Sequence, residues 1–468
     1  MLFLPNGTAL AKACAGTLLY DGERAITSAV FDSRQAREGA LFVAIVGERT
    51  DGHRYLVSAA ELGATAVLVE NDSIDLDALK ALGCSVVLCD STVKALGRLG
   101  VYHKSLYPTL TVAVTGSVGK TTTRQFIYAV LSRRYLTHKT EGNFNSDIGL
   151  PLTLLELTPD HRASVLELGM SAKGEISYLT RLVTPDVAVI TNIGTAHIEF
   201  LGSREAIRDA KMEITEGLKP GGHLLLNGDE PLLADVEGAV YVALRNPDAD
   251  YRAANLRYTP EGMCFDAICP SLTVPDCRIS TLGEHTVLDA MFAVAVGHLA
   301  GLSPDEIRCG LAAYEGVGMR QNIVRSHGIT YILDYYNASP ESIRASLAVT
   351  KEIAKQQSGR TVAVIGSVLE LGEHSEALHR AIGRDAASLP TDLLFTFGTD
   401  AAYVAEQAVA CGMSAESVIS FPDVSNAAPL TEAIRKALRP GDAVLLKASH
   451  SIRLERVADT LIDTLQTD

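Results

Sequence analysis

The chain has 468 residues, of which 47% are hydrophobic and 21% charged, and its net charge is −15 at pH 7. This composition is typical of a soluble globular protein of several domains, and the negative charge argues against a general binder of nucleic acids or anionic membranes. No apolar run approaches the roughly 18 residues of a membrane span, so we expect a cytoplasmic protein without a transmembrane segment.

The first predicted domain, residues 1–107, alternates short strands and helices. Apolar runs predict strands at 41–45, 66–69 and 86–89, and a helix at 55–62 follows the turn Asp51-Gly-His53. A further helix at 91–105 ends before Pro108, where we place a domain boundary because the residue before a proline disfavours helix.

The second predicted domain, residues 108–320, has strands at 163–168, 187–191 and 223–227, which favours a mostly parallel sheet with helices on both faces. The stretch 241–279 is rich in turn residues and predicts a small antiparallel excursion. A helix at 286–300 is apolar almost all round, so we expect it to be buried.

The third predicted domain, residues 321–468, repeats the alternation. Strands are expected at 329–334, 361–365, 393–397 and 443–447, with helices at 341–354, 375–387 and 453–465 and one helix between the last two strands. The fold class is therefore α/β, with a C-terminal Rossmann-like domain. The eight cysteines form no Cys-x-x-Cys pair, so we expect free thiols rather than a zinc or redox motif.

The chemistry centres on Thr115-Gly-Ser-Val-Gly-Lys-Thr-Thr122, which follows a β-branched run and opens an apolar-periodic helix. This is the setting of a phosphate-binding loop, although Val114 stands where the standard pattern has an earlier glycine. Lys120 would neutralise the β- and γ-phosphates and the Thr121 hydroxyl would hold Mg²⁺. The alternative is an ordinary glycine-rich turn. The expected ATP-binding residues here are Gly116, Ser117, Val118, Gly119, Lys120, Thr121 and Thr122.

Three other residues are candidates for the same site. Glu167 ends an apolar strand, which suits a metal ligand, although a strand-end glutamate often faces solvent. His197 follows a strand in a glycine-containing loop, but a lone histidine is usually structural. Lys211 lies on a predicted helix and, taken alone, would be a solvated surface lysine.

Together these segments resemble the Mur ligase family, ATP-dependent amide-forming enzymes of peptidoglycan precursor synthesis, over essentially the whole chain. Asn192, His197 and Ala210-Lys-Met-Glu-Ile214 match the family in order and spacing. The resemblance implies three domains around a central phosphate-loop sheet. It also implies that Thr121 and Glu167 bind one Mg²⁺, that His197 binds a second, and that Lys211 is carbamylated to become a metal ligand. Lys120, Lys211 and His197 would be catalytic, and further ATP contacts would come from His285, Arg320, Asp334 and Lys447.

Four stretches are most similar to the members that add D-alanyl-D-alanine to UDP-N-acetylmuramoyl-tripeptide, namely 140–153, 193–202, 336–340 and 369–379. Asp32-Ser-Arg34 and Asp51-Gly-His53 resemble the family's uridine-nucleotide domain. The resemblance implies that the cofactors are ATP and Mg²⁺, that the reaction passes through an acyl phosphate, and that the chain is a monomer that binds no nucleic acid. The implied substrate-binding residues are Ser33, Arg34, Asp51, His53, Asn143, Asn145 and Asn337.

Some positions depart from the family pattern. Thr286 and Asp289 replace two asparagines of the adenine-side motif, so both amides are lost and Asp289 adds an ionisable group. Ser367 stands where the family has aspartate, and His450 replaces an arginine. Three functions therefore stay open: the D-alanyl-D-alanine ligase, a paralogous ligase for another acceptor amine or a depsipeptide, and a nucleotide-binding protein without turnover.

Overall fold

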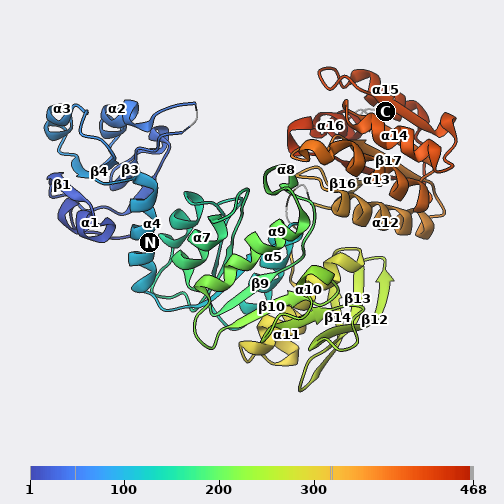
Figure 1. Ribbon diagram of the computed structural model, residues 1–468, viewed down its shortest axis with the longest axis horizontal. Helices are drawn as coiled ribbons and strands as arrows, with labels where there is room; N and C mark the ends of the chain where they lie inside the picture. Colours follow the sequence, from blue (N-terminus) through green and yellow to red (C-terminus); the bar gives the residue numbers. More distant parts are fainter. Residues whose placement is uncertain (1, 48, 317, 319, 464–468) are drawn as a thin grey trace. The chain divides into compact units, whose positions relative to one another are not determined.

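The computed structural model of the chain describes residues 2–47, 49–316, 318 and 320–463 (Figure 1). Contacts divide the chain into two compact units. The first unit holds the residues up to Thr115 with Arg134–Val189 and Met212–Leu224, and the second holds Gly116–Arg133, Ile190–Lys211 and the chain from Leu225 on. The described strands form three sheets with helices between them, which confirms the α/β class.

The first sheet has five strands in the order β1-β5-β4-β3-β2. Its strands are β1 (Thr17–Tyr20), β2 (Ser28–Val30), β3 (Ala40–Val43), β4 (Ala66–Val69) and β5 (Ser85–Leu88). Strands β2 to β5 run parallel, and β1 is antiparallel to β5. Leu41 and Val43 pack into one core and Phe42 into another, because successive side chains of a strand point to opposite faces. Its helices are α1 (Gly7–Cys14), η1 (Ser33–Gln35), η2 (Gly52–Tyr55), α2 (Leu56–Glu61), α3 (Leu76–Ala81) and α4 (Thr92–Ser105).

The second sheet has nine strands in the order β14-β13-β12-β11-β10-β9-β6-β8-β7. They are β6 (Leu110–Thr115), β7 (Thr137–Lys139), β8 (Ala163–Glu167), β9 (Val187–Ile190), β10 (His223–Asn227), β11 (Val240–Ala243), β12 (Tyr251–Thr259), β13 (Gly262–Ile268) and β14 (Thr273–Ile279). The pairs from β12 to β14 are antiparallel, which confirms the predicted excursion, whereas β11 pairs in parallel with both of its neighbours.

The helices of this middle part begin with α5 (Lys120–Leu131), which starts at the phosphate loop. The buried α10 (Glu284–Leu299) packs against α5, as its apolar sequence predicts. The others are α6 (Gly149–Leu154), α7 (Glu175–Val183), α8 (Ile198–Leu201), α9 (Arg204–Met212), η3 (Glu213–Gly217), η4 (Pro231–Leu233) and α11 (Pro304–Ala312).

The third sheet has six strands in the order β15-β16-β20-β17-β18-β19, and all its pairs except β15 with β16 are parallel. Its strands are β15 (Asn322–Ser326), β16 (Ile329–Leu333), β17 (Thr361–Gly366), β18 (Leu393–Phe397), β19 (Val418–Phe421) and β20 (Ala443–Lys447). Its helices are α12 (Pro340–Gln356), η5 (Gly372–His374), α13 (Ser375–Ser388), α14 (Ala401–Ala410), η6 (Ala415–Ser417), α15 (Ala428–Ala437), η7 (His450–Ile452) and α16 (Glu455–Asp463).

The prediction of one helix between the strands at 393–397 and 443–447 was wrong. Two helices, α14 and α15, lie there with the edge strand β19 between them. Strand β19 has only four residues and no buried side chain, and so short an edge strand carries little periodic signal in the sequence.

Other expectations agree with the structure. All eight cysteines, each among the described residues, are free thiols. Within the described ranges, no helix combines the length and apolarity needed to cross a bilayer. Each sheet lies inside one of the three predicted residue ranges, and the limits of those ranges stay predictions.

Candidate active site

The phosphate loop joins the end of β6 to the start of α5. Gly116 and Gly119 have positive φ angles of 151° and 86°, a region that favours glycine, and a Cβ on Gly116 would collide with Thr191. Gly119 is the N-cap of α5, so the first helical N–H groups open toward the loop. Strand, turn and helix therefore follow one another as the sequence predicts for a phosphate site.

Two residues directly after β9 hold this loop in shape. Asn192 accepts the Val118 N–H through Oδ1 at 2.9 Å and the Ser117 N–H through its main-chain oxygen at 3.2 Å. The Thr191 hydroxyl donates to the Val118 carbonyl at 2.5 Å. Asn192 was matched to the family pattern from the sequence, but neither residue was given a role in the site, although their place at the end of an apolar strand was a usable signal.

The polar groups of the loop suit an anion. The buried Ser117 hydroxyl has no hydrogen-bond partner within the described residues. A buried hydroxyl without a partner destabilises the fold, and a hydrogen bond to a phosphate oxygen would remove that cost. The Lys120 ammonium donates to the Gly116 carbonyl at 2.7 Å, beside the loop's own N–H groups. Thr121 is buried in the first turn of α5. Thr122 follows it there and hydrogen-bonds Tyr314.

His197 and Lys211 share the electrostatic field of Lys120. His197 has a φ of 65°, unusual for a non-glycine residue, and its Nδ1 lies 2.7 Å from Glu370 Oε2. Burial lowers the pKa of His197; Glu370 raises it, and the charges of Lys120 and Lys211 lower it further. The charges of Lys120, His197 and Lys211 therefore act on one another in the folded chain, and the shared site that the family resemblance implies for them stays a prediction.

Lys211 is not the solvated lysine that its helix alone suggests. Its side chain on α9 is 1% exposed, and burial, followed by the charge of Lys120, lowers the pKa of the Lys211 ammonium well below its ordinary value. Both effects disfavour the charged ammonium and favour the neutral amine. A neutral amine is the form that reacts with CO₂ to give a carbamate, which is the state that the family resemblance implies.

Glu167 lies in the first unit, at the end of β8. It pairs in register with Val114, and it is 3% exposed, so it does not face solvent. The Asn145 amide donates to its Oε1 at 2.9 Å, and its own N–H donates to Thr140 Oγ1 at 3.0 Å. Asn143 is exposed, and its carbonyl accepts the Asn145 N–H at 2.7 Å. A buried carboxylate fixed at a strand end suits Mg²⁺.

Asp289 lies beside the phosphate loop, next to Gly119 and Thr123. The Thr123 hydroxyl donates to Asp289 Oδ1 at 2.9 Å, and a Cβ on Gly119 would come within 2.6 Å of the same oxygen. Burial raises the pKa of Asp289 to about 8, against smaller opposing effects of Thr123 and Arg320. At neutral pH this group is therefore mostly a neutral acid. Thr286 donates its hydroxyl to the Gly283 carbonyl at 2.8 Å.

Asp289→Asn should make stability less dependent on pH. Between the ordinary carboxyl pKa of 3.8 and about 8, the folded chain holds a proton that the unfolded chain releases, so stability falls as pH rises. The amide cannot ionise and still accepts from Thr123. From the proton linkage we expect the advantage of the variant over the unaltered chain to grow by up to about 4 kcal/mol between pH 5 and pH 8, as measured by thermal unfolding at each pH. Asp248→Asn, at an exposed position, is the control, and a gain that does not change with pH would contradict the assignment.

In the second unit, Asp334 and Lys447 form a buried ion pair of 2.6 Å, and the Ser346 hydroxyl donates to the same Asp334 oxygen at 2.7 Å. Lys447 also donates to the Asn337 carbonyl at 3.3 Å, while the Asn337 side chain accepts the Ala338 N–H at 2.8 Å. These predicted ATP and substrate residues thus lie together at the carboxyl ends of β16 and β20.

Two other predicted ATP residues lie near this pair. Burial lowers the pKa of His285 to about 4, although the Asp334 charge opposes this shift. The Arg320 guanidinium lies 4.4 Å from the centre of the Tyr336 ring, a cation–π contact. The exposed His450 packs near Tyr336, with 5.9 Å between the centroids of the two rings. Ser367 is buried at the end of β17 and accepts the Ala401 N–H at 3.2 Å.

The predicted uridine residues lie in the first unit, after β2 and β3. Ser33 and Arg34 open the short helix η1, and Arg34 makes a two-pronged ion pair with Asp32, which lowers the pKa of Asp32. Asp51 caps η2 through the His53 N–H at 2.9 Å. Because β2 and β3 are parallel neighbours, both motifs stand at one edge of the sheet.

Comparison with known proteins decides the family. Residues 25–103 match the Mur ligase family catalytic domain, 114–297 the Mur ligase middle domain, and 319–450 the Mur ligase glutamate ligase domain. The chain is 37% identical to the UDP-N-acetylmuramoyl-tripeptide–D-alanyl-D-alanine ligase of Bacillus subtilis (strain 168), over 97% of this chain and 98% of that protein. The chain belongs to the Mur ligase family.

Solved structures of Mur ligases agree with its fold. MurF from Acinetobacter baumannii matches 98% of this chain and 100% of its own with a TM-score of 0.87 and 31% identity. A MurF ligase from Thermotoga maritima in complex with ADP matches 94% of this chain and 98% of its own, with a TM-score of 0.81 and 28% identity. The chain therefore has the three-domain Mur ligase fold.

Proposed function

We propose that this chain is an ATP-dependent, ADP-forming ligase that adds D-alanyl-D-alanine to UDP-N-acetylmuramoyl-tripeptide in peptidoglycan precursor synthesis. The observation that carries the proposal is the phosphate loop with its orphaned Ser117 hydroxyl and Lys120, whose charge acts on the buried Lys211 and lowers the pKa of that side chain. The relatives similar over nearly the whole chain bear this activity in their names. We propose that this protein acts in the cytoplasm as a monomer. Its product would serve cell shape and cell division.

The reaction has two steps. The terminal carboxylate of the tripeptide attacks the γ-phosphorus of ATP, and the bond to the β-phosphate oxygen breaks to leave an acyl phosphate and ADP. The amine of D-alanyl-D-alanine then attacks that carbonyl, loses a proton and expels inorganic phosphate, leaving a peptide bond. Lys120 and the loop N–H groups stabilise the negative charge of the transferring phosphoryl group.

In this proposal Thr121 and Glu167 would hold one Mg²⁺ and His197 a second, and carbamylated Lys211 would be a further metal ligand. Glu167 suits this role, because its buried carboxylate is held in place and supplies the oxygen ligands that Mg²⁺ prefers. When bound, the ion would spread charge over the phosphoryl oxygens and orient them. Asn145 keeps the Glu167 carboxylate in place through its amide.

A second candidate function is ligation of a different acceptor amine or of a hydroxy acid that gives a depsipeptide. Two residues that depart from the family pattern favour this candidate. Ser367 is committed to a main-chain N–H of α14, and His450 presents an imidazole where the family has a guanidinium. A non-catalytic nucleotide-binding protein is the third candidate, although Lys120, Glu167, His197 and Lys211 are all present.

One assay separates the three candidates. Purified protein is given UDP-N-acetylmuramoyl-tripeptide, ATP and Mg²⁺, with D-alanyl-D-alanine, other dipeptides or D-alanyl-D-lactate in parallel, and phosphate release is followed. The proposal expects turnover to be fastest with D-alanyl-D-alanine. A faster reaction with another acceptor supports the second candidate. Folded protein that binds ATP but releases no phosphate with any acceptor supports the third.

A further inference from the structure

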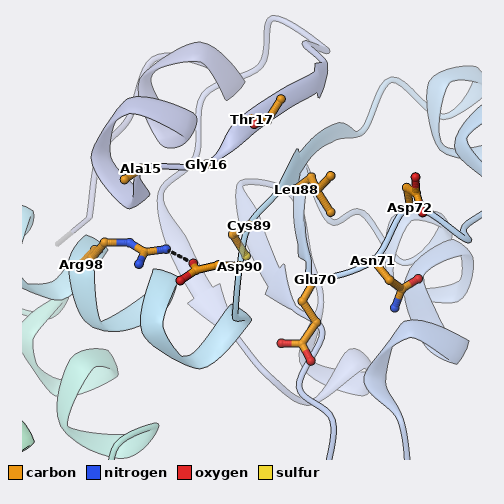
Figure 2. Close-up of a pocket in the computed structure, with 10 residues that line it drawn as sticks. All are labelled: Ala15, Gly16, Thr17, Glu70, Asn71, Asp72, Leu88, Cys89, Asp90 and Arg98. Atoms are coloured by element: carbon orange, nitrogen blue, oxygen red, sulfur yellow. Dashed lines mark hydrogen bonds and ion pairs between the residues drawn. The ribbon is translucent and has the colours of Figure 1, made fainter.

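Glu70 directly follows β4, at the edge of the first sheet that also carries the uridine motifs. A cavity of about 660 Å³ opens there, with Glu70, Asn71, Asp72, Asp90 and Arg98 in its wall (Figure 2). Arg98 is paired with Asp90 at 2.6 Å. Figure 2 shows the Glu70 side chain directed away from that of Asp72. Glu70 lies in the wall of this cavity, and its hydrogen bonds also connect it to His53 and Thr92.

The main chain of Glu70 fixes the ring of His53. The Glu70 N–H donates to His53 Nε2 at 3.1 Å, so this nitrogen carries a lone pair and no proton. His53 Nδ1 lies 2.7 Å from Asp51 Oδ1 and must hold the ring proton. The ring is buried, with 7% of its side chain exposed. Both ring nitrogens are used inside the chain, so His53 sets the shape of its turn and offers no nitrogen to a ligand.

The side chain of Glu70 fixes that main-chain N–H. Its Oε2 accepts the Thr92 N–H at 2.9 Å and the Thr92 hydroxyl at 3.1 Å, at the first turn of α4. A carboxylate at a helix N-terminus is favoured by the helix dipole and by the unpaired N–H groups there. Glu70 therefore links α4 to the His53 ring, and the ring links to Asp51, which caps η2.

We propose that Glu70 is a positioning residue of the uridine-nucleotide site, acting through His53 on the turn that carries Asp51. This inference rests on the proposed function, since the uridine nucleotide is the substrate half that the first sheet would bind. Without the Glu70 carboxylate, the main-chain N–H of residue 70 is no longer held against His53 Nε2. The His53 ring can then turn or change tautomer, and the start of η2 is no longer held in one conformation. Binding of the nucleotide weakens, whereas the ATP site is left unchanged.

The experiment compares Glu70→Ala, Glu70→Gln and the control Asp72→Ala. Asp72 lines the same cavity, is exposed, and forms neither of these hydrogen bonds within the described residues. We expect Glu70→Ala to raise the Kd for UDP, and the KM for the UDP-linked substrate, about tenfold, with kcat and the KM for ATP unchanged. Glu70→Gln should recover most of this loss, because its amide oxygen still accepts from Thr92. Asp72→Ala should match the unaltered chain.

Nitrogen-15 NMR of the His53 ring reports its tautomer, which a loss of helix stability alone would not change. The unaltered chain and Asp72→Ala should show a single Nδ1–H tautomer, and Glu70→Ala a mixture. Unchanged UDP binding in Glu70→Ala, or an unchanged tautomer, overturns the proposal. Thermal unfolding identifies any variant that has lost its fold, in which case Glu70→Gln decides. Absence of ligase turnover in the unaltered chain contradicts the proposed function instead, and UDP binding still tests Glu70.

Discussion

Lys211→Ala is expected to abolish ligation, lowering kcat on the order of a thousandfold or more. The amine of Lys211 is buried and its pKa is lowered by burial and by the charge of Lys120, which favours the neutral form that reacts with CO₂. The carbamate that forms is an anion with two oxygens, whereas alanine offers none. Short carboxylates such as acetate or propionate should enter the space left by the side chain and restore part of the rate. Phosphate release, with and without these acids, measures the effect.

Two further measurements make this prediction specific to the carbamate. Labelled CO₂ should give a carbamate carbon signal in the unaltered chain that Lys211→Ala lacks. Lys355→Ala removes an exposed lysine of α12 and should change neither the signal nor the rate. Full activity of Lys211→Ala, or a carbamate signal that survives the substitution, would show that Lys211 holds no part of the phosphoryl-transfer site.

Local pattern was enough to predict the phosphate loop, because strand, glycine turn and helix are contiguous from Leu110 to Leu131. It was also enough for the central strands, whose buried faces leave continuous apolar runs. Lys211 shows the limit of such reasoning. Its helix has the polar composition of a surface helix, and only the folded chain reveals that this side chain points inward. The family resemblance supplied what the periodicity of α9 did not.

Partners distant in sequence were missed for the same reason. Glu213 accepts the N–H groups of Gly174 and Ser177 and so caps α7, a contact across 39 and 36 residues that no spacing rule suggests. Glu370 meets His197 across an even longer separation. Short edge strands such as β19 were missed because a four-residue strand with half-exposed side chains carries little periodic signal. Long-range pairing, rather than propensity, decides these features.

Lys120→Ala should remove turnover while the fold persists, because the Lys120 ammonium lies at the surface-facing loop, where it donates to the Gly116 and Ser117 carbonyls. The loop would lose the point charge that faces the phosphates, so ATP binding weakens and phosphate release falls on the order of a thousandfold. Lys120→Arg should recover little, since a planar guanidinium does not replace a compact ammonium. Circular dichroism checks the fold.

The same substitution should act on Lys211. The charge of Lys120 lowers the pKa of Lys211, so its removal raises that pKa and leaves less neutral amine to react with CO₂. The carbamate anion would also lose a nearby cation. We therefore expect the labelled carbamate signal to fall in Lys120→Ala, and the double variant with Lys211→Ala to be no slower than either single one, because both act on one charged site. Losses that multiply, together with an unchanged carbamate signal, would mean that the two lysines work independently and that the shared site does not exist.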